Sequence, residues 1–316
     1  MKFILSISLL LGSLFSYGQK YNFQNFEKDE ISAKYIYDFS QDEKGVLYAA
    51  SSKGLLIYDG VSFKLLDKYD GLKDNFVSKI YIDKQNNIWL AYYEGGVTKL
   101  VPKLKGFSML YFKTEAIISI FEEDSQIKMV DVNSKVGTYS EVDKSFNFQI
   151  KELFDAKMVN QISLENGTQV YNTLEGLYIE KNKQLQVIPE TEFQYIKLLK
   201  RNKVTNTFVY ELDGVITAYE FENEVKKLFS LDLKEIGLNT KVTDLVFGEK
   251  QIIVSTLGQG IFEINFYDNQ LGSYSYINYS KSNGMLSDFV QSLFLDNASA
   301  FMDRVLWKWC FFAFRN

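Results

Sequence analysis

The chain has 316 residues, of which 46% are hydrophobic and 24% charged, so it is long enough to bury one large core or two modest ones. Its formal net charge is −5 and no long basic run is present, which argues against nucleic acid or an anionic membrane as a partner. It contains no histidine and a single cysteine, Cys310. Histidine-dependent nucleophile systems, histidine-ligated zinc and an internal disulfide are therefore excluded.

Residues 1–18 predict a cleavable signal peptide. A lysine at position 2 precedes a short apolar run, and the small residues Ser16 and Gly18 follow it. This run is short for a stable membrane span, and no later segment is long and apolar enough to be one. We expect the product to be exported to the periplasm or the extracellular space, the alternatives being a buried N-terminal helix or an uncleaved anchor.

Residues 19–296 contain an internal repeat. The segment DGLKDNFVSKIYID at 70–83 returns as NGMLSDFVQSLFLD at 283–296, an offset of 213 residues. Between these copies, a short apolar run, a few polar residues and a glycine recur. The glycines stand at Gly54, Gly96, Gly137, Gly176, Gly214 and Gly260, with spacings of 42, 41, 39, 38 and 46.

A repeat of this length, with short β-branched and aromatic runs split by turn residues, is typical of a β-propeller blade of four strands. The prediction is an all-β protein, a β-propeller of about seven four-stranded blades whose last blade is incomplete. Whether the ring closes is left open at this level.

The stretch IWLAYYEGG at 88–96 supplies the candidate ligand-binding residues Trp89, Tyr92 and Tyr93. In a blade, Trp89 is expected on the second strand with its side chain packed between sheets, and Gly96 is expected to turn the chain into the third strand. The structural interpretation of Trp89 is favoured over a binding role. Tyr92 and Tyr93 are less constrained and are expected to be able to reach a face of the ring.

Residues 297–316 differ from everything before them, being apolar and rich in tryptophan. Reading this segment one nucleotide forward forces a tryptophan at position 302 and a glycine at position 309. These are the positions of Trp89 and Gly96 plus the same offset of 213. We therefore predict that this tail is translated out of frame, the alternative being a genuine apolar terminal strand.

The segments FSQDEKGVLYAASSKGLLIYDGVSF at 39–63 and YDGLKDNFVSKIYIDKQNNIWLA at 69–91 resemble the two-component-regulator propeller repeats. These repeats form the sensor ectodomains of Bacteroidetes-type hybrid histidine kinases. The resemblance is strong over 33–100 and 280–296, and weak over 101–280. It implies recognition of a small molecule, commonly a saccharide, outside the inner membrane. It also implies a fragment that ends before the membrane helix and output module, with a possible dimer formed through those missing parts.

The acidic residues offer little further chemistry. Acidic groups such as Glu122 and Glu123 are interpreted as solvated turn residues, and Asp42 and Asp83 as turn acids that bind nearby backbone N–H groups. No metal site, cofactor or catalytic group is predicted, so the chain is expected not to be an enzyme. The alternatives are a secreted propeller scaffold for protein interaction and, third, a carbohydrate-active enzyme with two carboxyl groups facing one cavity.

Overall fold

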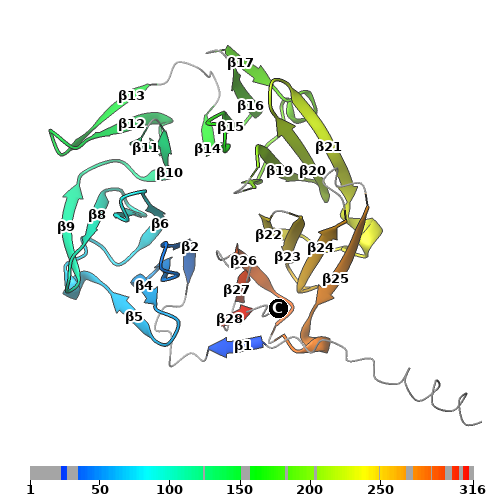
Figure 1. The fold of residues 1–316 in the computed structure, drawn as a ribbon, viewed down its shortest axis with the longest axis horizontal. Coiled ribbons are helices and arrows are strands. Elements are labelled where there is room, and N and C mark those ends of the chain that lie inside the picture. Colours follow the sequence, from blue (N-terminus) through cyan, green and yellow to red (C-terminus); the bar gives the residue numbers. More distant parts are fainter. Residues whose placement is uncertain are drawn as a thin grey trace, which may run out of the picture.

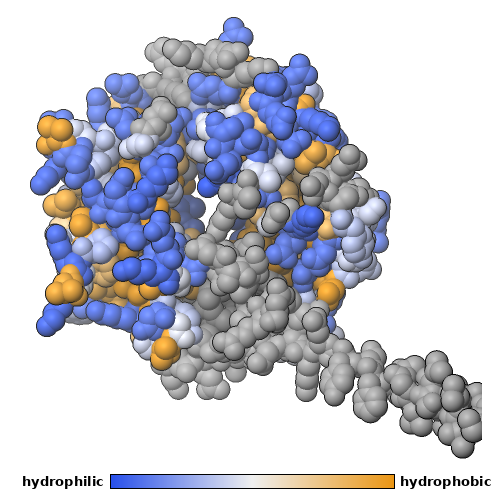
Figure 2. Space-filling view, in the orientation of Figure 1, coloured by the Kyte–Doolittle hydropathy of each residue, from blue (hydrophilic) through white to orange (hydrophobic). Residues whose placement is uncertain are grey.

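The computed structural model describes residues 35–295 except 124, 151–156, 182–183, 203–204, 249, 268–272 and 286, together with the backbone of strands at 23–26, 301–305 and 309–312. The protein is an all-β ring of antiparallel four-stranded sheets (Figure 1), and the space-filling view shows an opening near the centre of the ring, the central channel (Figure 2). Within the described residues the helical segments are four short 3-10 turns, Lys68–Asp70, Pro189–Thr191, Leu233–Ile236 and Lys281–Asn283.

Six blades are each built from four consecutive strands, with the first strand nearest the channel and the fourth at the rim (Figure 1). Blades 1 to 3 comprise β2 Ile36–Gln41, β3 Leu47–Ser51, β4 Gly54–Tyr58, β5 Phe63–Leu66, β6 Val77–Ile82, β7 Ile88–Tyr92, β8 Val97–Pro102, β9 Phe107–Phe112, β10 Ile117–Glu123, β11 Gln126–Asp131, β12 Lys135–Ser140 and β13 Ser145–Ile150. Blades 4 to 6 comprise β14 Met158–Ser163, β15 Gln169–Thr173, β16 Gly176–Lys181, β17 Gln184–Val187, β18 Leu198–Arg201, β19 Thr207–Leu212, β20 Val215–Phe221, β21 Val225–Asp232, β22 Val242–Phe247, β23 Gln251–Thr256, β24 Ile261–Phe266 and β25 Tyr274–Tyr279.

A further four-stranded sheet joins strands from the two ends of the described chain. Its order is β1 Phe23–Phe26, β28 Trp309–Phe312, β27 Phe301–Val305 and β26 Val290–Leu295. The rings of Phe39 on β2 and Phe294 on β26 lie 5.8 Å apart, so this sheet contacts blade 1 and the ring is closed in this conformation. The predicted signal peptide lies outside the described residues. Strands β27 and β28 fall in the segment predicted to be out of frame, and the reading frame stays a prediction.

The core lies between neighbouring blades because each sheet presents alternate side chains to the sheets on either side. One cluster joins Tyr48 and Leu55 of blade 1 to Ile80 and Leu90 of blade 2. Separate clusters join blades 2 and 3, blades 3 and 4, blades 4 and 5, and blades 5 and 6. Each blade is therefore stabilised mainly by the blades next to it in the sequence.

The repeat at an offset of 213 corresponds to one turn structure used twice. The 3-10 turns Lys68–Asp70 and Lys281–Asn283 both end in a glycine of left-handed conformation, Gly71 with φ 107° and Gly284 with φ 115°. Both carry a capping box at their N-terminus. The inner strands β6 and β26 then begin at the same repeat position, which confirms the sequence repeat.

The recurring glycine does not have one structural cause. Gly96 has φ 91° and turns the chain into β8, as predicted, in the left-handed region that favours glycine. Gly137 instead lies inside β12 opposite Phe148, where an added Cβ would come within 2.5 Å of the phenyl ring. The repeat length was predicted correctly, but in blade 3 the glycine accommodates a neighbouring ring rather than a turn.

Candidate ligand-binding face and central channel

Trp89 is a core residue and is unavailable to a ligand in this conformation. Its indole is fully buried, donates from Nε1 to Asp83 Oδ2 at 2.9 Å and meets the ring of Tyr139 edge-on at 4.8 Å. The favoured structural interpretation is confirmed. The prediction that Trp89 binds a ligand does not fit this burial, because blade 3 covers this side of the second strand of blade 2.

Tyr92 is also buried, which corrects the expectation that it reaches a face of the ring. Its hydroxyl lies 2.8 Å from Thr98 Oγ1 and accepts the backbone N–H of Lys73 at 3.2 Å. Burial raises the pKa of Tyr92 despite these hydrogen bonds. The side chain therefore connects the second and third strands of blade 2 to the loop that precedes β6, and it is positioned for structure.

Tyr93 is the predicted candidate that faces solvent. It is 62% exposed, and its ring stacks on Phe76 with the centroids 4.6 Å apart. Phe76 stacks in turn on Tyr37 at 4.7 Å, and Tyr37 is 41% exposed. We call Tyr37, Phe76 and Tyr93 the aromatic ladder. It combines large apolar area with phenolic hydroxyls, a combination suited to ligands that have both apolar and polar surface.

Sequence reasoning missed two members of the aromatic ladder. Phe76 lies in the repeated segment 70–83, and its counterpart in the segment 283–296 is Phe289, which is 49% exposed. Each of these residues immediately precedes an inner strand, where the chain enters the sheet from one face of the ring. The signal that could have found Phe76 was therefore a large apolar side chain recurring in a loop rather than in a strand.

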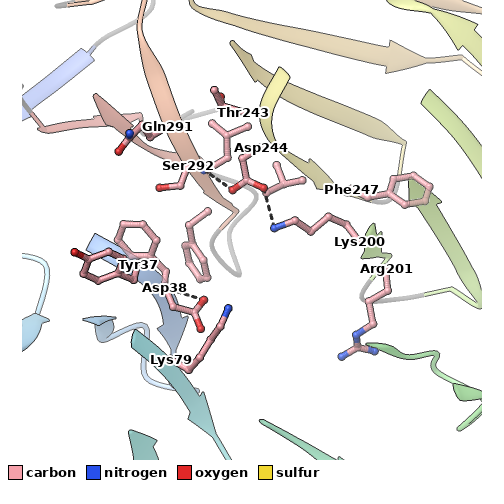
Figure 3. A pocket seen from close by; sticks show the side chains of 14 residues that line it. Tyr37, Asp38, Lys79, Lys200, Arg201, Thr243, Asp244, Phe247, Gln291 and Ser292 are labelled. Carbon is pink, nitrogen blue, oxygen red and sulfur yellow. Dashed lines mark hydrogen bonds and ion pairs between the residues drawn. The ribbon is translucent and has the colours of Figure 1, made fainter. Parts of the chain in front are cut away.

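The channel forms a cavity of about 420 Å³ lined by the inner strands β2, β6, β18, β22 and β26 (Figure 3). Tyr37 lines this cavity and also belongs to the aromatic ladder, so the ladder begins at the channel. The charged residues that line it are Asp38, Lys79, Lys200, Arg201 and Asp244.

The two channel carboxylates hold neighbouring blades together. Asp38 Oδ2 accepts the backbone N–H of Ile80 in blade 2 at 3.2 Å, and Asp244 Oδ2 accepts that of Leu293 on β26 at 3.0 Å. The other oxygen of each carboxylate accepts the N–H of the next residue along its own strand. Both strands carry a register shift at this point, which turns the aspartate toward the adjacent blade.

Lys200 is committed to Asp244, as Figure 3 shows, with its Nζ 2.9 Å from Asp244 Oδ1. Burial by itself would lower the pKa of Lys200, but the charge of Asp244, the hydrogen bond to it and the charge of Asp38 together raise the pKa above its usual value. Lys200 therefore stays protonated and links blade 5 to blade 6.

A smaller hollow of about 280 Å³ lies between blades 5 and 6. Tyr195, which is 54% exposed, lines it beside Lys197, Lys241 and Glu211. Burial raises the pKa of Glu211, while the N–H of Gly214, which donates to its carboxylate, and the nearby lysines oppose the rise. The hollow pairs an aromatic side chain with hydrogen-bonding groups of both charges.

The acidic pair Glu122 and Glu123 requires a correction, because both residues lie in strand β10 and not in a solvated turn. Glu122 is nearly buried and pairs with Lys84 at 3.5 Å, and Glu123 pairs with Lys128. Three consecutive acidic residues had hidden the alternation of buried and partly exposed side chains along this strand. In the part of the chain that the structure describes, no three potential metal ligands cluster, and no helix has the length and apolar character needed to cross a membrane.

The turn acids behave as predicted. Asp83 Oδ1 accepts the backbone N–H groups of Gln85 and Asn87, and Asp42 Oδ1 accepts those of Lys44 and Val46. Asp83 thereby organises the turn between β6 and β7, the same segment that carries the family resemblance.

Residues 71–94 match the family model described as the two component regulator propeller. The similarity to this family is therefore shown for one repeat of the chain. The match begins at Gly71, which ends the 3-10 turn Lys68–Asp70, and covers strand β6 and strand β7 with Trp89, so the resemblance drawn from these residues is confirmed. A comparison with curated proteins finds no match to this sequence.

Solved structures share the fold. The extracellular domain of a hybrid two component system from B. thetaiotaomicron superposes with a TM-score of 0.68 at 14% identity, over 94% of this chain and 40% of that chain. A second such domain from the same organism gives 0.68 at 14% identity, over 92% and 41%. The chain thus spans about 40% of the length of these extracellular domains.

An enzyme has the same architecture. Virginiamycin B lyase from Staphylococcus aureus, in a catalytically inactive histidine-to-alanine variant with quinupristin, superposes with a TM-score of 0.67 at 11% identity, over 94% of this chain and 99% of that chain. At these identities the likeness establishes the propeller fold alone.

Proposed function

We propose that this chain is the extracytoplasmic ligand-sensing propeller of a two-component signalling receptor, cut off before the membrane helix and output module. The match of residues 71–94 to the two component regulator propeller carries this proposal, and the similarity to extracellular domains of hybrid two-component systems supports it. The proposal includes a seventh blade that closes the ring and a signal peptide at residues 1–18 that directs export.

The ligand we propose is a small molecule, with a saccharide favoured, bound at the face that carries the aromatic ladder. The rings of Tyr93 and Tyr37 form the two ends of the ladder, and sugar rings present apolar C–H faces that stack on such side chains. The hollow beside Tyr195 supplies a second place with an aromatic wall and carboxylate acceptors. Hydroxyl groups of a saccharide would donate to such acceptors.

We propose binding rather than catalysis. The lyase with this fold has been described in an inactive form that lacks one histidine, and the present sequence contains no histidine. The channel carboxylates Asp38 and Asp244 already accept hydrogen bonds from backbone N–H groups. That arrangement suits them to holding blades together.

The test is binding of a panel of neutral oligosaccharides to the purified exported chain, measured by titration calorimetry. Tyr93→Ala is expected to weaken binding about tenfold, the effect of removing one buried aromatic contact with the ligand. Tyr267→Ala is the matched control, since Tyr267 is 70% exposed and follows β24 at the far end of its blade. No binding by any saccharide, or equal losses for both variants, would contradict the proposed site.

The proposed truncation has its own test. Sequencing the gene across codons 296–302 and several hundred bases beyond is expected to show a one-base correction that restores a tryptophan at position 302. The open frame should then continue into further repeats, a membrane helix and a kinase or DNA-binding module. A confirmed frame and stop, with nothing related downstream, would favour a secreted propeller that binds a partner protein.

A further inference from the structure

The central channel is lined by more cationic than acidic side chains. Of the described residues that line the cavity, three are cationic and two are acidic, although the chain as a whole has a net charge of −5. We propose that the channel is a binding site for the anionic group of a small molecule, a carboxylate or a phosphate, with Lys79 and Arg201 as its cationic ligands. This inference does not depend on the signalling role of the chain.

The two carboxylates form no ion pair with Lys79 or Arg201 among the described residues. Each oxygen of Asp38 accepts a backbone N–H, from Phe39 at 3.0 Å and from Ile80 at 3.2 Å. The oxygens of Asp244 likewise accept backbone N–H groups, and one of them also accepts Lys200. The carboxylates are therefore held in place by these hydrogen bonds, and each of their oxygens already accepts at least one backbone N–H.

Lys79 and Arg201 are left without such partners. Among the described residues, neither side chain has an ion pair or a hydrogen bond. Figure 3 shows Lys79 extending from β6 into the channel and Arg201 on β18, on the other side of the cavity. An anion in the cavity would meet cationic side chains carried by two different blades, so charge-assisted hydrogen bonds could form from both sides.

The cavity has suitable size and electrostatics. Its volume of about 420 Å³ is within the range of small-molecule sites. Inward-facing charges in a hollow surrounded by protein act more strongly than surface charges, because water screens them less and the walls focus the field. Lys200 contributes to this field, since its raised pKa keeps it protonated beside the cavity.

The experiment uses the purified exported chain, with inorganic phosphate and glucuronate as probes and glucose as the uncharged counterpart of glucuronate. Binding is measured by titration calorimetry at low and at physiological ionic strength. We expect at least one of the two anions to bind, more weakly at the higher ionic strength. Preference for phosphate or for glucuronate distinguishes the two sources of the anionic group.

Variants locate the site. Lys79→Gln and Arg201→Gln are each expected to weaken anion binding about tenfold, the effect of losing one charge-assisted contact, and Lys79→Arg to retain most of it. Lys64→Gln is the matched control for overall charge, because Lys64 is an exposed residue of the rim strand β5. Thermal unfolding of each variant verifies that the ring is intact.

No binding by either anion overturns the inference, as does a Lys79→Gln variant that binds like the wild type. A loss as large in Lys64→Gln also overturns it, since the effect would then be one of net charge alone. Failure here is distinguishable from failure of the proposed saccharide site, which is measured with neutral ligands and the Tyr93→Ala variant.

Discussion

Blades 1 and 2 join their first two strands through a turn anchored on an aspartate that also bonds an aromatic side chain, whereas blades 3, 4 and 6 place other kinds of residue at the register of that aromatic side chain. In blade 2 the residue paired with the fifth position of the inner strand is Trp89, bonded to Asp83. In blade 1 it is Tyr48, whose hydroxyl donates to Asp42 at 3.3 Å. Blade 3 has Lys128 there, paired with Glu123.

Two other blades have an aliphatic side chain at this register in place of a hydrogen-bonded or ion-paired one. Blade 4 places Val170 at this register position and blade 6 places Ile253, and both are fully buried. All five blades nevertheless form the same four-stranded sheet. The difference teaches that strand register and burial between blades define the position, and that the family motif is one of several ways to fill it.

The largest expected effect comes from removing the tryptophan. Trp89→Ala should lower the free energy of unfolding by about 3–5 kcal/mol, because it leaves a cavity between blades 2 and 3 and removes the indole hydrogen bond to Asp83. Val170→Ala at the matching register should cost about 2 kcal/mol, the value for losing two buried methyl groups. Urea unfolding measures both changes. Equal losses would show that the tryptophan and its hydrogen bond stabilise the protein no more than a buried valine at the same register.

The anchoring aspartates should differ by a smaller amount. Asp83→Ala leaves four hydrogen-bond donors without their acceptor, including the buried indole N–H. It should lower the free energy of unfolding by about 2–3 kcal/mol. Asp42→Ala removes two backbone contacts and the longer contact to Tyr48, so its cost should be nearer 1 kcal/mol. The same unfolding experiment applies, and a larger loss for Asp42→Ala would reverse the comparison.

The smallest effect is expected for Tyr48→Phe, below about 1 kcal/mol at neutral pH, because one long hydrogen bond is lost. Burial and the adjacent Asp42 raise the pKa of Tyr48 to about 12, against about 10 for an exposed tyrosine. The folded state therefore favours the protonated phenol, so its contribution to stability is full below about pH 10 and is lost as the pH rises toward 12.

Urea unfolding between pH 9 and 12 checks this last prediction, where the pH range follows from the pKa of about 12 in the folded state and about 10 in the unfolded state. The wild type should lose stability over that range more steeply than Tyr48→Phe. Parallel curves for the two proteins would show that Tyr48 is already ionised, or that it is accessible to solvent, in the folded state.

Much of the fold could be predicted because each blade is a local unit with a period visible in its turns. The candidate ligand-binding site was harder to predict from the sequence. Tyr92 and Tyr93 are adjacent letters, yet one is buried and the other exposed, because β7 ends between them. The aromatic ladder depends on Tyr37, Phe76 and Tyr93 meeting across two blades. No spacing rule connects these three positions.

The channel charges were missed for a related reason. Lys79 is a single basic residue and Lys200 has only Arg201 beside it, so each of them, taken alone, is indistinguishable from a polar residue on any half-exposed strand. They share a cavity only because the ring brings five inner strands around one axis. Closure of the ring, rather than any local pattern, creates that environment.

The contact between Phe39 and Phe294 has a consequence for how the molecule folds. Most contacts between blades join segments about one repeat apart, which a growing chain can make early at low entropic cost. This contact joins residues far apart in the chain and requires a loop that contains all six blades to close. Refolding is therefore expected to show a fast phase, in which neighbouring blades stack, followed by a slow phase that ends with the first and last sheets meeting.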